Sequence, residues 1–289
     1  MFKESDKKKR LPQKPIRSRC CAKPTESNLL AALAFALLGD VPYSQPQANL
    51  LDGMIERMNA EKLAFVVHVG DITSGTGPCG DEWLEDRRKQ FARFRHPFVL
   101  LPGDNEWTDC HRSGFDPLER LEKWRALFCF QYGNLKLERQ TGHCENVRWI
   151  AGNVVFAGLN IPGSNNNLGR DPAEHAARMQ AVFAWLDEAE ALARGRDGLV
   201  VLMHANPFVT RRSGADGYTE VRERLRRLGE AMPGKVLLVH GDTHQYQDDE
   251  PLPGLRRIEV HGSPHIRWTK ANIERSGTRL FNVEPVAPE

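Results

Sequence analysis

One local pattern occurs five times in this chain: a short apolar run that ends in an aspartate or a histidine. The run over residues 64–73 (AFVVHVGDIT) is rich in β-branched residues and stops at Gly70-Asp71. An apolar run bounded by turn residues predicts a strand that is covered on both faces. Open α/β sheets place their chemistry just beyond the carboxyl ends of their strands, so a carboxylate at this position indicates a functional site.

The other four runs end in the same kind of residue. They cover residues 32–40, 98–104, 199–204 and 236–242, and they end at Asp40, Asp104, His204 and Asp242, with His244 just after the last. If these strands are parallel neighbours, we expect six ligand-type side chains to converge on one edge of a sheet. Clustered carboxylates repel one another and are costly to remove from water unless a positive charge lies among them. A pair of divalent metal ions is the simplest partner for such a cluster.

The order and spacing of these motifs resemble the calcineurin-like metallophosphoesterases. That family carries D-x-H, then G-D, then G-N-H-E/D, then a lone H after a strand, then G-H-x-H. The matching stretches here are GDVPY, VGDIT, PGDNE, LMHANP and HGDTH. Gly-Asp alone is a common dipeptide, but five motifs in the right order along nearly the whole domain make a specific joint signal.

The resemblance implies an α/β fold with a two-sheet β-sandwich core flanked by helices on both outer faces. Helical spacing of apolar residues and capping residues predict helices over residues 46–59, 81–93, 117–130, 173–194 and 218–232. Residues 147–150 and 154–160 predict an antiparallel pair around Gly152-Asn153. Residues 255–260 and 266–273 predict a closing meander.

The resemblance also implies a dinuclear metal site. Its expected ligands are Asp40, Asp71, Asp104, His204, Asp242 and His244. Asp71 corresponds to the bridging ligand, with Asp40 and His244 on the first ion and Asp104 and His204 on the second. Oxygen with some imidazole suits Mn²⁺, Fe²⁺ or Mg²⁺, with Zn²⁺ as a further possibility. The expected reaction is hydrolysis of a phosphate ester by a hydroxide that bridges the two ions.

The chain departs from the family pattern at two of the metal-binding motifs. The histidine of D-x-H is Pro42 here, so the first ion loses a ligand, and Tyr43 or a water molecule is expected to take its place. The first histidine of G-H-x-H is Asp242, which is still a ligand type. His240, two residues earlier on the same strand face, competes for this role.

A third departure concerns the reaction itself. The histidine of G-N-H-E, usually the general acid, is Asn105, and an amide cannot donate a proton as an acid does. We expect His111 or Arg112, slightly downstream, to take over contact with the phosphate or the leaving group. Asn160 and Asn165, together with Arg112, are further candidates for positioning the substrate.

Plainer interpretations apply to several of these residues. Taken singly, each of Asp40, Asp71 and Asp104 is explained equally well as a helix cap. All three together with two histidines favour the metal site. His68 lies inside an apolar strand and is expected to be a core histidine with its bonds satisfied. Residues 165–167 (NNN) are typical of a turn, and residues 222–227 (RERLRR) of a solvated helix face.

Length and charge exclude little but give useful bounds. The 289 residues carry a formal net charge of +2, which gives no strong field for nucleic acid, and no apolar run is long enough to span a membrane. Residues 1–28 are expected to be a disordered basic extension, followed by one metallophosphoesterase-like domain over residues 29–289. KKKR and RSR before residues 29–38 imitate a signal peptide, but that apolar run leads straight into Asp40, which favours a core strand.

Cysteine placement leaves the compartment open. Cys79 and Cys110 each follow a ligand strand by a few residues, so a disulfide between them is plausible and would imply an oxidising compartment such as the periplasm. The alternative is two free thiols in the cytosol, and the lack of a clear cleavable signal favours the cytoplasm.

Three functions compete on these observations. The first is a metal-dependent phosphoesterase acting on a small-molecule phosphate ester. The second is a non-catalytic binding module on the same fold, favoured by the missing histidines at positions 42 and 105 and disfavoured by the six retained ligand types. The third is a nuclease, which would need a basic groove that the charge balance does not support. Neither a nucleic acid nor a membrane is an expected partner.

Overall fold

The computed structural model describes residues 33–130, 133–209, 214–275 and 279–286. Residues 32–289 form a unit distinct from residues 1–31, and the described residues all belong to this larger unit. The expected extension over residues 1–28 therefore lies outside the described residues. The apolar run before Asp40 is a strand of the core, as expected.

Two mixed sheets carry the fold. The first has the order β12-β11-β1-β2-β3. Its strands are β1 (Leu33–Leu38), β2 (Val66–His68), β3 (Phe98–Leu100), β11 (Trp268–Ile273) and β12 (Phe281–Val286). Strands β1, β2 and β3 are parallel, and β11 lies antiparallel to β1. The parallel strands are short apolar runs and are almost fully buried, because packed layers cover them on both faces.

The second sheet has the order β4-β5-β6-β7-β8-β10-β9. Its strands are β4 (Glu138–Gln140), β5 (His143–Ala151), β6 (Val154–Gly158), β7 (Gly198–Leu202), β8 (Val236–His240), β9 (Gln247–Leu252) and β10 (Leu255–Glu259). The expected antiparallel pair is confirmed, with Ile150 opposite Val155. The expected closing meander is wrong, because β10 lies parallel to β8 while β11 joins the other sheet.

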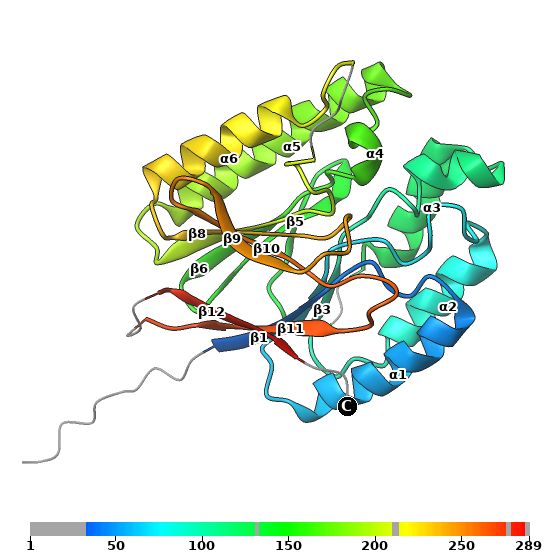
Figure 1. Ribbon diagram of the computed structural model, residues 1–289, viewed down its shortest axis with the longest axis horizontal. Helices are drawn as coiled ribbons and strands as arrows, with labels where there is room; N and C mark the ends of the chain where they lie inside the picture. The colour runs from blue at the N-terminus through cyan, green and yellow to red at the C-terminus, as the bar shows by residue number, and fades with distance from the viewer. Residues whose placement is uncertain (1–32, 131–132, 210–213, 276–278, 287–289) are drawn as a thin grey trace, which may run out of the picture. The chain divides into compact units, whose positions relative to one another are not determined.

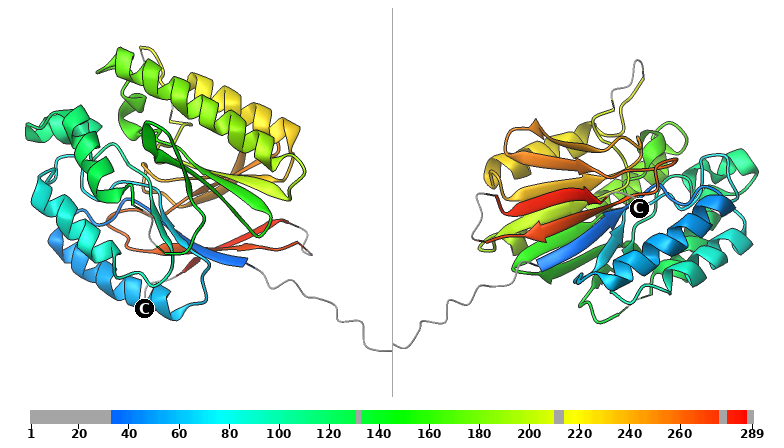
Figure 2. Two further views of the ribbon diagram at one scale, coloured as in Figure 1. Left: turned by 180° about the vertical axis from the view of Figure 1, so that it is seen from behind. Right: turned by 60° about the horizontal axis from the view of Figure 1, so that its bottom comes forward.

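Helices cover the outer face of each sheet (Figures 1 and 2). Helices α1 (Gln45–Ala60), α2 (Asp81–Phe91) and α3 (Pro117–Phe128) lie beside the first sheet, and α5 (Pro172–Ala193) and α6 (Thr219–Ala231) beside the second. Two short elements, the 3-10 helix η1 (Thr108–Ser113) and α4 (Gly163–Asn166), lie in the connecting loops. The expected helices are all present. Asp116 caps α3 by accepting a hydrogen bond from the Glu119 amide at 2.8 Å.

Apolar side chains fill the space between the two sheets. Phe35 and Phe65 from the first sheet contact Phe156 from the second, with ring centroids 5.1–5.3 Å apart. Separate apolar clusters join α1, α2 and α3 to the first sheet, and α5 and α6 to the second. The predicted two-sheet core flanked by helices is therefore confirmed.

The five strands that end in aspartate or histidine are not neighbours in a single sheet. Three of them, β1, β2 and β3, belong to the first sheet, and β7 and β8 belong to the second. The expectation of convergence at one sheet edge is therefore wrong in detail. The side chains still meet, because the two sheets are stacked and their strand-end loops open into a common cleft.

Two disulfides are present among the described residues. The expected bond joins Cys79 to Cys110 with the Cα atoms 5.7 Å apart, within the reach of a disulfide. Both sulfur atoms lie 3.3 Å from the Asn105 carbonyl oxygen, so the bond braces the loop that follows β3. The second disulfide joins Cys129 to Cys144, which the sequence did not indicate. No helix within the described ranges is long and apolar enough to cross a bilayer.

Candidate metal centre

The backbone turns sharply at four of the six expected ligands. Asp40, Asp71, Asp242 and His244 all have left-handed backbone conformations, with φ between +55° and +78°. Residues other than glycine adopt this region uncommonly, and such strained positions cluster at functional sites. The strained backbone at these strand ends therefore indicates a functional site.

His204 lies at the centre of one half of the cleft. Its Nε2 atom is 3.0 Å from Asp104 Oδ1, 3.3 Å from Asp71 Oδ2 and 3.9 Å from Asp242 Oδ1. On the other side of the ring, Nδ1 lies 3.2 Å from the Val69 carbonyl oxygen, to which it donates. This bond leaves Nε2 as the atom that faces the carboxylates, which is the usual arrangement for a metal-binding histidine.

Two buried atoms in this half have no hydrogen-bond partner. His204 Nε2 and Asp104 Oδ1 are close, yet neither makes a hydrogen bond with acceptable geometry. Buried polar atoms are nearly always satisfied, so each exception needs an explanation. Lone pairs that aim at a common point rather than at each other are what a bound cation requires.

The other half is arranged around the Tyr43 hydroxyl. Its oxygen lies 2.9 Å from His244 Nε2, 3.1 Å from Asp71 Oδ2 and 3.4 Å from Asp40 Oδ1. His244 Nδ1 donates to the Ser263 carbonyl at 2.8 Å, which leaves Nε2 directed at the cleft. The tyrosine thus reaches the three side chains expected to hold the first ion, where Pro42 has removed the family histidine.

Glycines let the backbone approach the carboxylates closely. A Cβ atom on Gly163 would lie 2.5 Å from Asp104 Oδ1 and 2.6 Å from Asp242 Oδ1. A side chain on Gly241 would likewise collide with Asp40, and one on Gly103 with Asp71. The half of the cleft around His204 is therefore closed by the backbone, and only glycine fits at position 163.

Electrostatics favour a cation in the cleft. Burial raises the pKa of Asp71, which His204 opposes and Asp104 reinforces. Burial, followed by the charge of Asp104, raises the pKa of Asp242 to about 7. Divalent cations would offset this repulsion and keep the carboxylates ionised. The donor atoms, their burial and the glycine cradle therefore fit divalent metal ions, and oxygen with imidazole suits Mn²⁺, Fe²⁺, Mg²⁺ or Zn²⁺.

The clusters of metal-binding type among the described residues match this division only in part, because they share His204 rather than Asp71 and leave out His244. One cluster contains Asp40, Asp71 and His204, and the other contains Asp104, His204 and Asp242. His240, the competitor for Asp242, belongs to neither, and its Nδ1 lies 2.9 Å from the Gly241 carbonyl oxygen. His68 is a satisfied core histidine, as expected, with Nε2 donating to the Val41 carbonyl and Nδ1 accepting from the Gly70 amide.

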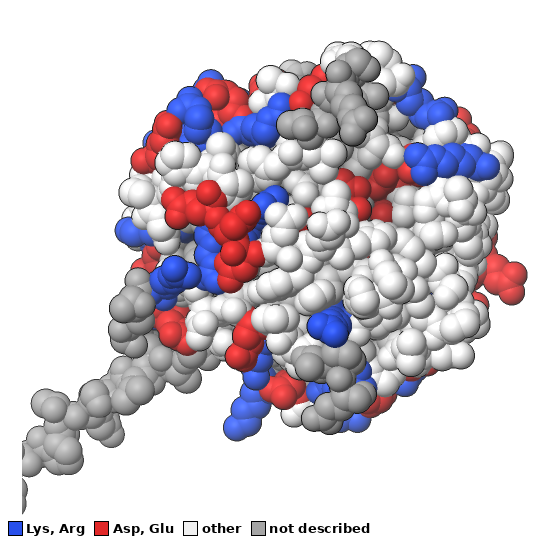
Figure 3. Space-filling model, viewed as in Figure 1, with Lys and Arg blue, Asp and Glu red and all other residues white. Residues whose placement is uncertain are grey.

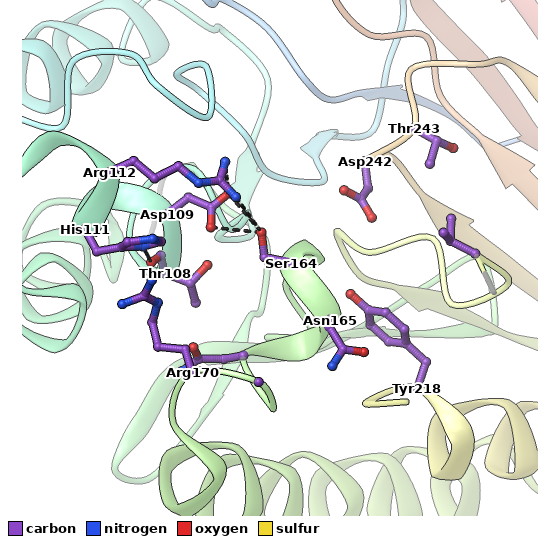
Figure 4. Close-up of a pocket in the computed structure, with 13 residues that line it drawn as sticks. Thr108, Asp109, His111, Arg112, Ser164, Asn165, Arg170, Tyr218, Asp242 and Thr243 are labelled. Carbon is purple, nitrogen blue, oxygen red and sulfur yellow. Dashed lines mark hydrogen bonds and ion pairs between the residues drawn. The ribbon is translucent and has the colours of Figure 1, made fainter. Parts of the chain in front are cut away.

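The three predicted catalytic residues have different surroundings. Asn105 uses both amide hydrogens, one on Asp71 Oδ2 at 2.6 Å and one on the Thr73 carbonyl at 2.9 Å. It therefore holds Asp71 in place. His111 and Arg112 lie on η1 and line a pocket of about 840 Å³ that also contains Asp242 (Figure 4).

The two candidate positioning asparagines also differ. Asn165 lines the pocket, but its amide is bonded to the backbone of Ala215 and Gly217. Asn160 is fully buried outside the pocket lining and bonds to Glu145. The Asn165 amide is thus engaged within the protein, whereas Asn160 Oδ1 is buried without a partner.

Two residues of the site escaped sequence reasoning. The Ser164 hydroxyl lies 2.8 Å from Asp104 Oδ2 and 2.8 Å from Asp109 Oδ1, so it links a predicted ligand to a second carboxylate. Asp109 in turn pairs with Arg112 at 2.7 Å. Two sequence features could have indicated them. Ser164 belongs to a polar loop after a strand end, and Asp109 follows Asp104 by five residues.

Ser164 begins a run of four left-handed residues, which continues as Asn165, Asn166 and Asn167. The predicted turn is thus present, with an unusual handedness. Arg178, only 3% exposed, holds it from α5 by donating to Asn166 Oδ1 at 2.7 Å and to the Asn166 carbonyl at 3.0 Å. His175 Nδ1 donates to the same carbonyl at 2.7 Å. The turn is therefore held firmly over the site.

Surface charge marks the same place. Figure 3 shows acidic side chains gathered in a hollow below α4 and beside α3, with basic side chains next to them. The arginines of residues 222–227 pair with carboxylates on their own or a neighbouring segment instead of forming a free basic surface.

Fold and site together define a two-sheet α/β protein with a buried carboxylate–imidazole cluster in its strand-end cleft. The family model of the calcineurin-like phosphoesterases matches residues 33–246, and the chain belongs to this family. Phosphoester hydrolysis is the general activity that this membership supports. A comparison with curated proteins finds no match.

Solved structures share the fold at low sequence identity. A dimetal phosphatase from Danio rerio is 14% identical with a TM-score of 0.53, and the match covers 88% of this chain and 98% of the other. A putative 5'-nucleotidase from Staphylococcus aureus is 15% identical with a TM-score of 0.57, covering 90% and 55%. The purple acid phosphatase PPD1 from yellow lupin is 13% identical with a TM-score of 0.54, covering 89% and 52%. This chain thus spans about half of the last two proteins.

Proposed function

We propose that the chain hydrolyses a small phosphate ester with the help of two divalent metal ions held in the strand-end cleft. The observation that carries the proposal is the pair of buried, unpartnered atoms His204 Nε2 and Asp104 Oδ1, 3.0 Å apart. A core without a ligand would satisfy these atoms or replace them with apolar groups. Their retention supports a bound cation.

The division of the cleft suggests the role of each ligand. Asp71 contacts residues of both halves, so we assign it to both ions. The first ion would be held by Asp40, Asp71 and His244, with the Tyr43 oxygen close by. The second would be held by Asp71 together with Asp104, His204 and Asp242. Asp104 and Asp242 of this group lie against Gly163.

Bound ions would polarise the phosphoryl oxygens and lower the pKa of a water molecule. The remaining tasks belong to side chains of the protein. Asn105 fixes both oxygens of Asp71 through its backbone and amide N–H groups, at 3.0 and 2.6 Å. Arg112, anchored on Asp109, supplies a guanidinium beside the ligands. His111 uses Nδ1 on the Thr108 carbonyl, so Nε2 is the atom left to contact the phosphate or the leaving group.

Hydrolysis of aryl phosphate mono- and diesters with Mn²⁺, against a chelator-treated sample, tests the proposal. We expect turnover only with metal, and loss of both turnover and bound metal in His204→Ala. His96→Ala is the matched control, because His96 bonds to the Met58 carbonyl on α1 and belongs neither to the ligand clusters nor to the pocket lining. Equal turnover with and without metal would rule the proposal out.

A second candidate is a binding module that uses the same cleft without catalysis. It is favoured by Pro42 and Asn105, which stand where the family pattern has a ligand and a general acid. Metal content measured on the same sample separates the two, because a binding module that has lost its metals would carry none, whereas the phosphoesterase would retain them. The Cys79–Cys110 disulfide supports a location of the chain in an oxidising compartment.

A further inference from the structure

We propose that the pocket beside the metal centre binds a second anionic group of the substrate. The substrate would then be a phosphate ester that also carries a distal carboxylate or phosphate. This inference rests on the proposed function, because it places the scissile phosphate at the metal end of the pocket.

The pocket is larger and more polar than a phosphate alone requires. Its volume is about 840 Å³, which lies within the range of cavities that hold whole small ligands. The metal end is marked by Asp242 and Ser164. Val209 is the one aliphatic side chain among the residues that line the pocket. The lining therefore offers many hydrogen-bonding and charged groups to a polar leaving group.

The side of the pocket across from Asp242 carries basic side chains. Arg112 on this side also reaches the Ser164 hydroxyl at 3.4 Å, beside the metal end, so Arg170 is the guanidinium left for a second anion. Figure 4 shows Arg112, His111 and Arg170 on one side of the pocket, across from Asp242 and Tyr218. Arg112 is paired with Asp109, whereas Arg170 forms no ion pair with any carboxylate in the described part of the chain. A guanidinium that faces a pocket without a protein partner is suited to a carboxylate or a phosphate, which it binds through two parallel hydrogen bonds.

The backbone on this side of the pocket is held in place before any ligand arrives. The short helix η1 is tied down by the Cys79–Cys110 disulfide and by the bond from His111 to the Thr108 carbonyl. The Arg170 amide donates to the Asn167 carbonyl at 3.1 Å, which attaches Arg170 to the left-handed turn. Binding to groups that are already ordered loses less conformational entropy.

A buried acceptor adds a second requirement. Asn167 is 3% exposed and lines the pocket, its Nδ2 donates to Glu174, and its Oδ1 has no partner. This unpartnered acceptor adds to the polar character of the lining. The pocket therefore fits a polar linker with an anion at each end.

Binding of unreactive phosphonates to the Mn²⁺-loaded full chain tests the proposal. Calorimetry would compare ω-phosphonoalkanoates and α,ω-alkanediphosphonates with alkylphosphonates of the same chain lengths. We expect at least one chain length at which the second anion tightens binding by about tenfold, the usual effect of one charge-assisted hydrogen-bonded contact. Comparison of the carboxylate and phosphonate series shows which anion is preferred.

Arg170→Gln should abolish most of this preference, with the loss seen in the ratio of the two dissociation constants. Arg95→Gln is the matched control, since it removes an exposed arginine that lies outside the pocket and should keep the ratio. No preference at any chain length, or a preference unchanged by Arg170→Gln, overturns the inference. Hydrolysis of the corresponding esters is a separate readout, so absence of turnover with an intact binding preference would count against the proposed function alone.

Discussion

The two halves of the proposed metal cleft contain similar side chains but differ in how well the protein satisfies them by itself. Around His204, two buried atoms have no hydrogen-bond partner and the backbone of Gly163 closes the space. Around Tyr43, one hydroxyl lies within 3.4 Å of all three expected ligands. His244 on this side is also 30% exposed, whereas His204 is fully buried.

This difference predicts unequal affinities. The half around His204 is incomplete without a cation, so cation binding there gains the full interaction with groups that are otherwise unsatisfied. In the half around Tyr43, a cation competes with hydrogen bonds that already exist. We therefore expect the second ion to bind more tightly and the first ion to exchange more readily.

Asp71→Asn should have the largest effect, because Asp71 contacts both halves. The amide keeps the shape of the side chain but removes the charge that both cations share. We expect loss of at least one metal ion per chain, measured by elemental analysis, and a fall in turnover of roughly a thousandfold or more. A variant that kept both ions and full activity would contradict the assignment of Asp71.

Gly163→Ala tests the half around His204 alone. Its Cβ would meet Asp104 Oδ1 and Asp242 Oδ1 at 2.5 and 2.6 Å, so the two carboxylates must move apart. We expect the affinity for the second ion to fall roughly a hundredfold, in line with disturbed ligand orientation. Gly53→Ala is the control, because its nearest neighbour is an Arg57 side-chain atom at 3.7 Å. Equal metal titrations for the two variants would show that Gly163 does not limit the site.

Much of this arrangement could be predicted from the sequence, because strands and their terminal residues are local features. The strands ending at Asp40, Asp71 and Asp104 followed from apolar runs and turn residues, and the two-sheet core followed from the family resemblance. The pairing of β11 with β1 could not be predicted, since Trp268–Ile273 joins a strand more than two hundred residues earlier. The Cys129–Cys144 disulfide spans only 15 residues, but the spacing of cysteines does not by itself say which of them pair.

The left-handed turn over the site was also beyond local patterns. Three consecutive asparagines indicated a turn, since asparagine tolerates the left-handed region better than most residues. Its handedness depends on Arg178 from α5 and on Tyr218, whose hydroxyl accepts from the Asn166 amide at 3.0 Å. Such partners are specified only by the folded chain, which is why Ser164 and Asp109 were missed.

Tyr43→Phe tests the half around Tyr43. If the phenol oxygen takes the place of the histidine that Pro42 replaces, its removal should weaken the first ion by about tenfold and leave the second ion unchanged. Calorimetric titration with Mn²⁺ would resolve the two binding events. Weakening of the tighter event instead would mean that the two halves are assigned the wrong way round.

The pH dependence of metal binding offers a milder test. Because the pKa of Asp242 is raised from 3.8 to about 7, the native metal-free protein holds a proton that the unfolded chain releases. Stability of the metal-free protein should therefore fall as the pH rises through this window. Mn²⁺ must displace the proton, so its affinity should be about tenfold higher near pH 8 than near pH 6.

Melting temperatures measured with and without Mn²⁺ at both pH values check this prediction. The increase caused by Mn²⁺ should be larger at the higher pH. Asp242→Asn should reduce the difference between the two pH values, since the amide does not titrate. If Mn²⁺ raised the melting temperature of the unmodified protein equally at both pH values, this would argue against a proton on Asp242 that the metal displaces.

Asp104→Asn should have the smallest effect, although Asp104 is an expected ligand. Its Oδ1 atom faces His204 and would be retained, while the new amide nitrogen would replace Oδ2 beside Ser164. The Ser164 hydroxyl can accept from this nitrogen and still donate to Asp109, so every hydrogen bond is preserved. We expect turnover to fall by less than about tenfold, because only one negative charge is lost and asparagine is the residue of the family pattern here.

Burial and the charge of Asp104 raise the pKa of Asp109 to about 7, so the same change should lower that pKa and leave Arg112 more firmly paired. If Asp104→Asn proved as damaging as Asp71→Asn, the Asp104 charge would be essential, and the assignment of Asp71 as the only shared carboxylate would be wrong even though the fold is right.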